Sequence, residues 1–178
     1  MPNGLTLAIT LLIILLFLAY MVSIIMNFFN PFYSTPKKHL KKIIDKFNLN
    51  GEQKFVDLGS GDGRVVFATN KKYKCLSVGY EISPVLLIIQ KLAKLLYHPF
   101  NKNIKIKEES FLNADLSEYN VIYCCLPPTI LENLEEKFRN ELKNNTKVFS
   151  YKVKLPNRKA KEHRIDDSML YEYTYPSS

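Results

Sequence analysis

The first 36 residues carry no Lys, Arg, Asp or Glu, although the chain of 178 residues has 25 basic and 17 acidic side chains. Within this stretch an uncharged, mostly apolar run of 25 residues extends from Leu5 to Phe29. As an α-helix it would be about 37 Å long, enough to cross a hydrocarbon core of about 30 Å with some tilt. Buried core helices rarely reach this length, and a cleaved signal peptide would need a basic start and a small-residue cleavage site. We therefore expect a retained transmembrane helix.

Charge is unequal on the two sides of this helix. Five lysines and one acid, Asp45, lie between Lys37 and Lys46, whereas only the terminal amine precedes the helix. Because basic loops stay on the cytoplasmic side of membranes, we expect a single-pass protein with its N-terminus outside. The body would then lie on the cytoplasmic face or its topological equivalent. Three cysteines, an odd number and too few for a disulfide scaffold, agree with a reducing compartment.

The sequence predicts three parts. Residues 1–30 form the anchor, residues 31–50 a connector with a lysine-rich helix, and residues 51–178 a domain of ordinary size. In the connector, Thr35 is expected to cap the helix, with Pro36 at its first position. A net charge of +8 is compatible with nucleic-acid binding, but half of it lies in the lysine-rich helix. There it is better explained as a topology signal and a contact with the membrane surface.

Beyond the connector, short apolar segments alternate with amphipathic ones. The apolar segments predict strands at 54–58, 75–81, 104–108, 119–126 and 146–153. Helices are predicted at 36–47, 64–70, 84–97 and 129–142, the last capped by Thr129. A final antiparallel pair is predicted at 161–165 and 169–175. Strands alternating with helices indicate βαβ units, so we expect an α/β fold with a mostly parallel sheet and antiparallel closing strands.

A glycine-rich turn is predicted after the first strand, in the segment Val-Asp-Leu-Gly-Ser-Gly-Asp-Gly-Arg at 56–64. Such a turn lets backbone atoms approach a bound nucleotide, and Glu81 at the end of the next strand can accept hydrogen bonds from both ribose hydroxyls. Dinucleotide sites favour Gly-x-Gly-x-x-Gly, but here Arg64 takes the last glycine position. Asp57 and Asp62 would repel a pyrophosphate and attract a cationic methionine moiety. The pattern therefore favours S-adenosylmethionine over NAD.

In its strand–turn–helix context this segment resembles the first motif of the class I S-adenosylmethionine-dependent methyltransferases, which implies a Rossmann-like sheet. A narrower resemblance extends from residue 33 to about residue 173. An apolar helix, an aromatic-Ser-Thr-Pro connector, a lysine-rich helix, Asp-Leu-Gly-Ser-Gly-Asp-Gly-Arg and Gly-Tyr-Glu follow one another. This layout is similar to the membrane-anchored protein-lysine methyltransferases of the ATP synthase c subunit and the adenine nucleotide translocase, and to their prokaryotic relatives.

The resemblance also implies which residues hold the cofactor. Gly59 and Gly61 would line the methionine and ribose, Asp57 would order the loop or meet the ammonium group through water, and Glu81 would bind the ribose diol. The implied cofactor-binding set is Asp57, Gly59, Ser60, Gly61, Asp62, Gly63, Glu81, Ser110 and Phe111. Many class I enzymes have an acid at the position of Ser110. Adenine recognition would then fall to the backbone at Ser110–Phe111 or to Asn113.

The residues at the end of the fourth predicted strand indicate which chemical group accepts the methyl group. Methyltransferases of nucleic-acid and glutamine amino groups have Asn or Asp before the Pro-Pro pair and an aromatic residue after it. This chain has Leu126 and Thr129 at those positions, which argues against DNA, RNA or glutamine acceptors. A lysine acceptor must be neutral, and a dry, partly aromatic pocket favours that form. Tyr33, Thr35 and Tyr123 are predicted to line this pocket.

The histidines and cysteines are expected to have structural roles and not catalytic ones. The histidines and cysteines show no metal-ligand spacing, so no metal site is predicted. The three histidines, His39 among them, are expected at the surface or at helix ends. Cys124 and Cys125 are expected to pack in the core.

The hypothesis from sequence is a membrane-anchored, S-adenosylmethionine-dependent protein-lysine N-methyltransferase. Its partners would be the membrane and a membrane or membrane-proximal protein substrate, with no nucleic acid, and the enzyme itself would be a monomer. Three alternatives stay open: a small-molecule or lipid methyltransferase, a non-catalytic Rossmann-like membrane module, and a dinucleotide-dependent oxidoreductase, which the loop acids disfavour.

Overall fold

The computed structural model describes residues 3–29 and 33–175. The chain divides into two compact units, Met1–Tyr33 and Ser34–Ser178. The boundary lies in the segment that the sequence predicts as a connector. Each unit is described here by itself.

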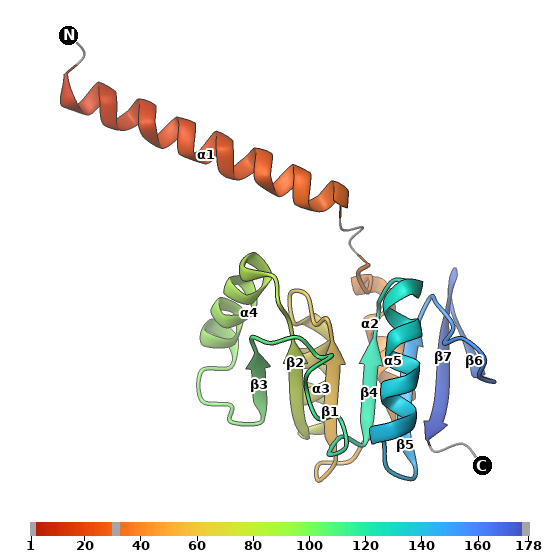
Figure 1. Ribbon diagram of the computed structural model, residues 1–178. Helices are drawn as coiled ribbons and strands as arrows, with labels where there is room; N and C mark the ends of the chain where they lie inside the picture. Colours follow the sequence, from red (N-terminus) through yellow and green to blue (C-terminus); the bar gives the residue numbers. More distant parts are fainter. Residues whose placement is uncertain (1–2, 30–32, 176–178) are drawn as a thin grey trace. The chain divides into compact units, whose positions relative to one another are not determined.

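The first unit is one helix, α1 (Gly4–Phe29), drawn in red in Figure 1. The span from Gly4 to Val22 is long and apolar enough to cross a membrane, and none of it is buried. A signal sequence near the N-terminus has the same length and composition. The helix itself agrees with the sequence prediction.

The second unit is built on a seven-stranded sheet with the order β3-β2-β1-β4-β5-β7-β6 (Figure 1). The strands are β1 Lys54–Leu58, β2 Leu76–Tyr80, β3 Ile104–Lys107, β4 Val121–Cys124, β5 Thr146–Tyr151, β6 Lys161–Ile165 and β7 Ser168–Tyr175. The five strands from β3 to β5 in this order are parallel, and β7 pairs antiparallel with β5 and β6. This sheet confirms the predicted Rossmann-like α/β fold with antiparallel closing strands.

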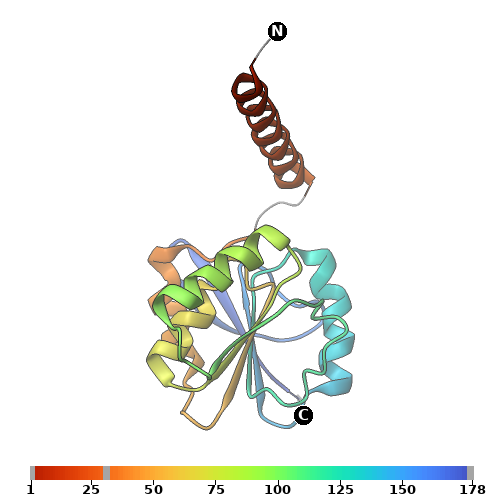
Figure 2. The ribbon, with the colours of Figure 1, turned by 90° about the vertical axis from the view of Figure 1, so that its left-hand side faces the viewer.

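Helices cover both faces of the sheet. They are α2 Lys37–Phe47, α3 Arg64–Tyr73, α4 Pro84–Tyr97 and α5 Pro128–Glu141. Figure 2 shows α5 on one face and α2 and α3 on the other. Helices α3, α4 and α5 connect β1 to β2, β2 to β3 and β4 to β5, and in each case the two strands lie side by side in the sheet.

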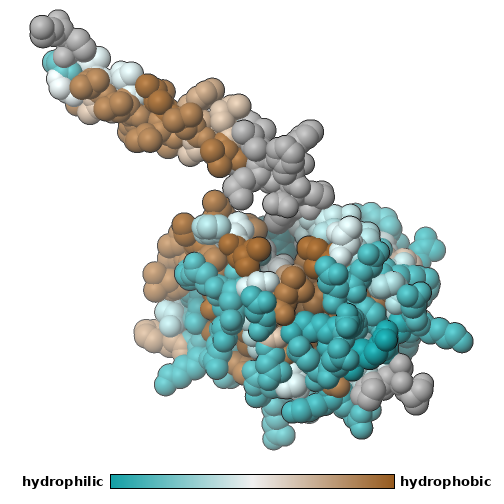
Figure 3. Space-filling view, in the orientation of Figure 1, coloured by the Kyte–Doolittle hydropathy of each residue, from teal (hydrophilic) through white to brown (hydrophobic). Residues whose placement is uncertain are grey.

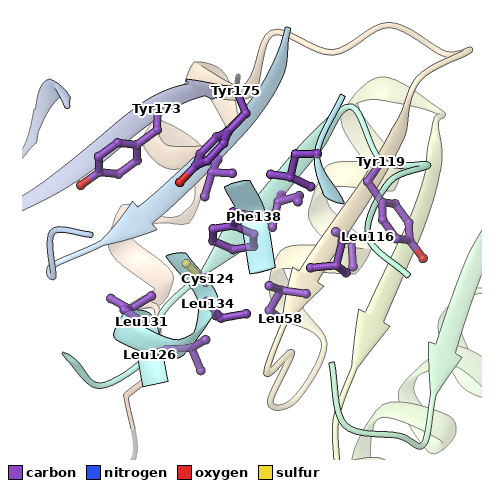
Figure 4. Close-up of a cluster of buried hydrophobic side chains, with 14 of the residues drawn as sticks. Leu58, Leu116, Tyr119, Cys124, Leu126, Leu131, Leu134, Phe138, Tyr173 and Tyr175 are labelled. Atoms are coloured by element: carbon purple, nitrogen blue, oxygen red, sulfur yellow. The ribbon is translucent and has the colours of Figure 1, made fainter. Parts of the chain in front are cut away.

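Two hydrophobic clusters hold these layers together. On the α5 side, leucine and aromatic side chains of the helix pack on β1, β4 and β7 (Figure 4). On the opposite side, the Phe47 ring of α2 lies 5.1 to 5.6 Å from the rings of Phe55, Tyr123 and Phe149. Each such aromatic pair stabilises by about 0.5–1.5 kcal/mol beyond the area it buries. The lysine-rich helix is therefore an integral layer of the second unit.

Two predicted helix caps are wrong. Helix α2 begins at Lys37 with Pro36 as its N-cap residue, and the Thr35 hydroxyl pairs with Tyr123 instead. Helix α5 begins at Pro128 with Pro127 as its N-cap residue, one position before the predicted start. Proline suits a first helical position because its missing N–H would have no partner there.

Two predicted strands are shorter than expected. Strand β4 ends at Cys124, because the following Pro-Pro pair cannot donate to a sheet ladder and already belongs to the start of α5. Strand β5 ends at Tyr151, because Lys152 adopts the left-handed conformation with φ 71° and turns the chain. Both strands end near the edge of the sheet where the candidate site lies.

Candidate functional site

The candidate site lies at the carboxyl ends of β1, β2 and β4. These strands meet where the strand order reverses, which is the place where open α/β sheets bind ligands. Asp57 of β1 is in register with Gly79 of β2 and with Tyr123 of β4. Side chains at matching positions of parallel strands point to the same face, so Asp57 and Tyr123 project to the same side of the sheet.

The glycine-rich turn leaves β1 in a conformation that only glycine adopts easily. Gly59, Gly61 and Gly63 have φ values of 76°, 59° and 81°. Space is also limited at the first of them. A Cβ at Gly59 would lie 3.0 Å from Leu126 Cδ2 and 4.0 Å from the Phe111 ring. The turn therefore presents bare backbone at the sheet edge.

Glu81 ties this turn to the end of β2. Its Oε2 accepts a hydrogen bond from the Gly61 N–H at 2.8 Å, and its Oε1 accepts bonds from the Ile82 and Ser83 N–H groups at 2.9 Å each. The side chain is buried, with 8% of the residue exposed. A carboxylate oxygen can accept two hydrogen bonds, so Oε2 keeps one acceptor position for a ribose hydroxyl.

Two further residues that support the turn were missed by the sequence analysis. Gln90 of α4 is fully buried and donates to the Gly61 carbonyl at 2.6 Å and to Ser60 Oγ at 3.0 Å. Gly79 lies under the same serine, because a Cβ there would come 2.6 Å from Ser60 Oγ. The sequence carries one signal for Gln90: it is the single amide side chain in a helix that otherwise consists of apolar residues, two lysines and one tyrosine.

Asp57 is a buried carboxyl group at the centre of the site. The residue is 3% exposed, and its carboxylate has no hydrogen-bond donor among the described residues. Burial raises its pKa well above the ordinary value, and the charges of Glu81 and Asp62 raise it further. Such a group attracts a cation or a strong donor, which would stabilise its charged form.

Asp62 is held by Arg64 at the start of α3. The guanidinium group contacts both carboxylate oxygens, at 2.7 to 3.0 Å. Partial burial acts to raise the pKa of Asp62, but the hydrogen bonds and charge of Arg64 outweigh it and lower the pKa. Arg64 also donates to the Thr35 carbonyl at 2.9 Å, which connects the turn to the segment before α2.

Thr35 and Tyr123 meet beside the turn, although 88 residues separate them in sequence. Their hydroxyl groups lie 2.5 Å apart, and both residues are buried. Burial raises the pKa of Tyr123 well above its ordinary value, and the neighbouring Cys125 thiol adds to this, so the phenol stays protonated. The structure thus brings together two of the three residues predicted to line the pocket. The third, Tyr33, belongs to the first unit, and its role stays a prediction.

The segment after β3 supplies one aromatic side chain to the turn. The Phe111 ring packs against the hydrophobic core on one side and approaches Gly59 on the other. Ser110 is half-buried, and its Oγ accepts a hydrogen bond from the Leu112 N–H at 3.3 Å. Asn113 is exposed. Among these residues, Phe111 is the one best placed to contact a planar base.

One interpretation of the histidines is confirmed only in part, because the residue lies at a helix end but is buried. His39, expected at the surface or at a helix end, lies in the first turn of α2 but is 1% exposed. Its Nδ1 lies 2.5 Å from the Tyr151 hydroxyl, and its Nε2 lies 3.2 Å from Asp167 Oδ1. The ring therefore joins α2 to β5 and to the turn between β6 and β7. The contacts span more than 100 residues, which no local pattern reveals.

The cysteines confirm the prediction of core packing. Cys75, Cys124 and Cys125 are all buried free thiols. Burial raises the pKa of Cys124 to about 12 and that of Cys125 to about 11. Both thiols are therefore protonated at neutral pH and poor nucleophiles.

Residues 57–162 match the model of the ANTKMT methyltransferase domain family, and they include the glycine-rich turn, Glu81 and β4. The chain belongs to this family. A protein-lysine N-methyltransferase of the archaeon Saccharolobus islandicus is 26% identical over 82% of this chain and 91% of its own length. The adenine nucleotide translocase lysine N-methyltransferase of mouse is 31% identical over 58% of the chain, which spans 44% of that longer protein. The resemblance drawn from the sequence motifs is confirmed.

Solved structures agree on the fold. An RNA methyltransferase from Salinibacter ruber, determined with S-adenosylhomocysteine, superposes with a TM-score of 0.75. It is 24% identical in sequence, and the match covers 82% of this chain and 95% of that one. Family membership and fold together identify the chain as an S-adenosylmethionine-dependent methyltransferase.

The geometry of the site fits this cofactor. Asp57 is a buried carboxyl group without a protein donor, which suits the ammonium or sulfonium end of the ligand. Glu81 keeps an acceptor position for the ribose, and Gly59 leaves bare backbone beside the Phe111 ring.

Proposed function

We propose that this methyltransferase is a membrane-anchored protein-lysine N-methyltransferase. The observation that carries the proposal is the archaeal relative named protein-lysine N-methyltransferase, which this chain matches over 91% of the relative's length. A shared acceptor class is therefore the simplest account of a match that covers nearly the whole protein.

In this proposal the cofactor lies along the carboxyl ends of β1 and β2. Asp57 faces its cationic amino-acid end, Glu81 accepts from a ribose hydroxyl, and Phe111 packs on the adenine. Ser60, Gly61 and the rest of the turn shape the backbone around it, and Asp62 holds the turn through Arg64. When bound, the cofactor supplies an electrophilic methyl group on a sulfonium sulfur. Transfer in line to an amine nitrogen is then mostly a matter of positioning.

Thr35 and Tyr123 would border the acceptor channel. Their paired hydroxyl groups lie on the same side of the sheet as Asp57 and next to Arg64, which bonds the Thr35 carbonyl. Because Tyr123 stays protonated, it can accept a hydrogen bond from an incoming amine without carrying charge. A buried, uncharged border favours the neutral amine over the ammonium form.

The proposed architecture keeps the three predicted parts. Residues 1–30 anchor the chain in the membrane, residues 31–50 connect and complete the fold, and residues 51–178 carry the cofactor. We propose that the body lies on the cytoplasmic face or its topological equivalent, because lysines at its start are the usual signal for this orientation. A tether confines enzyme and acceptor to one surface and raises their effective concentration. We propose a monomer acting on a membrane or membrane-proximal protein.

The proposal is tested with methyl-labelled S-adenosylmethionine and the full-length protein in membranes. Label should appear in the protein fraction with the wild-type enzyme and should be absent with Asp57→Ala. Gly51→Ala is the matched control, because a Cβ at this exposed glycine makes only an ordinary contact of 3.7 Å with the Tyr73 carbonyl. Label in the lipid extract and none in protein would replace the proposal with a lipid methyltransferase. Failure to bind the cofactor would favour a non-catalytic module.

A further inference from the structure

Helix α4 carries its apolar side chains on the outside of the body. Six of them form one continuous helical face, here called the α4 apolar face: Val85, Ile88, Ile89, Leu92, Leu95 and Leu96. Each is exposed by 45% to 71% of its surface. The inner side of the helix consists of Leu87 and Gln90, which are buried against the body. Figure 3 shows hydrophobic surface gathered over α4.

Such a face is unusual for a soluble surface. Helix α5, which has the same length of 14 residues, presents polar side chains such as Glu132, Glu136 and Asn140 to solvent. Contiguous apolar patches of this kind mark sites that contact another protein or a membrane. The apolar surface continues beyond α4 at Phe100, which is 93% exposed.

Basic residues outnumber acidic ones around the face. Between residues 82 and 107 there are five lysines and no Asp or Glu, and the two acids that follow, Glu108 and Glu109, pair with Lys91 and Lys107. Lys91 and Lys94 lie on α4 itself, and Lys102 lies in the following loop. An apolar stripe bordered by lysines is the pattern of helices that lie in the interface of anionic membranes, with the lysine stems reaching toward the headgroups.

A membrane is also the surface nearest to the body, if α1 spans it. Only seven residues, 30–36, separate the end of α1 from the start of α2. Fully extended, they reach at most about 25 Å. A compact unit of this size is roughly 40 Å across. A tether shorter than the body itself limits how far the body can move from the lipid surface, so contact between one of its faces and the headgroups is within reach.

We propose that the α4 apolar face docks onto a bilayer of anionic phospholipid and fixes the orientation of the catalytic body. The inference rests on the proposed function in one respect, the membrane anchor. It also has a consequence for the site. Gln90 on the inner side of α4 bonds the Gly61 carbonyl, and Glu81 bonds the N–H groups at the start of the helix. The docked helix thus holds the cofactor turn directly above the lipid surface, where a membrane-proximal lysine would arrive.

The docking is tested with full-length protein in vesicles of anionic or neutral phospholipid. An environment-sensitive fluorophore is attached at Leu92→Cys or Leu96→Cys, with Glu132→Cys and Asn140→Cys on α5 as matched controls. The native cysteines are buried, so labelled wild-type protein gives the background. Fluorescence at the α4 positions should shift to the blue and lose most of its intensity to a quencher carried on lipid chains. The α5 positions should stay in water.

Stronger quenching in anionic than in neutral vesicles would show that the lysines beside the α4 apolar face contribute to membrane binding. A second variant, Leu96→Glu in the Leu92→Cys protein, should return the probe to water while cofactor binding, measured by calorimetry, stays unchanged. Equal quenching at Leu92 and Glu132 would overturn the inference. So would a blue shift in lipid-free detergent that grows with protein concentration, since it would assign the face to a second copy.

The same vesicles separate this inference from the proposed function. Lipid contact at Leu92 without methyl transfer to protein would contradict the proposed lysine methyltransferase activity and would support the docking. Methyl transfer to protein by an enzyme whose Leu92 probe stays in water would support the proposed activity and contradict the docking. Alkaline extraction reports whether α1 holds the chain in the bilayer in either case.

Discussion

Replacing Gly79 with alanine should displace the glycine-rich turn, because the new Cβ would collide with Ser60. A Cβ at this position would lie 2.6 Å from Ser60 Oγ, 2.8 Å from Ser60 Cβ and 3.0 Å from Val66 Cγ2. The first of these is about 0.8 Å short of the 3.4 Å at which ordinary contact begins. Ser60 cannot simply move away, because its backbone N–H bonds the Tyr80 carbonyl at 2.9 Å and its hydroxyl bonds Gln90. The turn must shift or the strand must bend.

The expected cost follows from this overlap. Overpacking a buried site destabilises by about 1–3 kcal/mol, which lowers the melting temperature of a protein of this size by about 2–12 °C. Alanine also reduces the entropy of the unfolded chain, which stabilises by about 0.4–1 kcal/mol. Gly51→Ala measures that gain alone, since its Cβ would meet only Tyr73 O at 3.7 Å. Gly79→Ala should therefore melt below wild type, and Gly51→Ala at or slightly above it.

The assay is thermal unfolding of the full-length variants in lipid nanodiscs, with and without S-adenosylmethionine. Gly79→Ala should also bind the cofactor more weakly, because the Ser60 backbone belongs to the cofactor turn. Adding Ser60→Gly removes the two shortest contacts and should recover part of the lost melting temperature. Equal melting of Gly79→Ala and Gly51→Ala, with equal cofactor affinity, would refute this account of the turn.

Three further changes test other parts of the site. Asp57→Asn should weaken cofactor binding by about 10- to 150-fold in calorimetry, the loss expected for a hydrogen bond to a charged group. Because the pKa of the Asp57 carboxyl group is raised in the folded protein, this group stabilises the fold at low pH, and the contribution is lost as the pH rises through the folded-state pKa. Asp57→Asn has no such group, so its free energy of unfolding, measured with denaturant, should depend less on pH in this range. Gln90→Leu leaves the Gly61 carbonyl without its partner and should cost about 1–3 kcal/mol in the same unfolding assay. Phe111→Ala should weaken binding by about 5- to 150-fold, the usual value of one base–aromatic stack, and it should also lower the melting temperature of the free protein, because the ring packs against the hydrophobic core.

Each of these expectations has a contradicting result. If Asp57→Asn binds the cofactor with unchanged affinity, Asp57 does not contact the cofactor. If the pH dependence of the unfolding free energy is unchanged, the pKa of this carboxyl group is not raised in the folded protein. A Gln90→Leu protein with wild-type melting would show that the turn does not depend on α4. If S-adenosylmethionine and its adenine-free fragments lose affinity equally in Phe111→Ala, the ring does not contact the base.

The sequence predicts those features of the site that depend on local pattern. Three glycines between a strand and a helix can form little other than a tight turn, and Glu81 follows at the spacing of one βα unit. Alternation of strand and helix also predicts the parallel part of the sheet, since crossover connections have one preferred hand. The C-terminal pair was predicted as antiparallel, but its insertion of β7 between β5 and β6 follows only from the three-dimensional pairing.

Features that depend on distant contacts were not predictable. Thr35 has the sequence position of a helix cap, yet its hydroxyl is drawn to Tyr123 because α2 packs over β4. His39 is buried for the same reason, between Tyr151 and the turn after β6. Gln90 looks like one polar residue on an apolar helix, and only the fold shows that the apolar side faces outward. Propensity and pattern report on neighbours in sequence, whereas these roles are set by packing between elements.

The chemical identity of the methylated group tests the central claim most directly. Membranes containing the full-length enzyme are incubated with methyl-labelled S-adenosylmethionine, the labelled protein is hydrolysed completely, and the labelled amino acid is identified by chromatography against methylated standards. The account predicts label in methylated lysine with wild-type enzyme and none with Asp57→Ala. Label in methylated arginine, histidine or glutamine, or label that persists in Asp57→Ala, would contradict it.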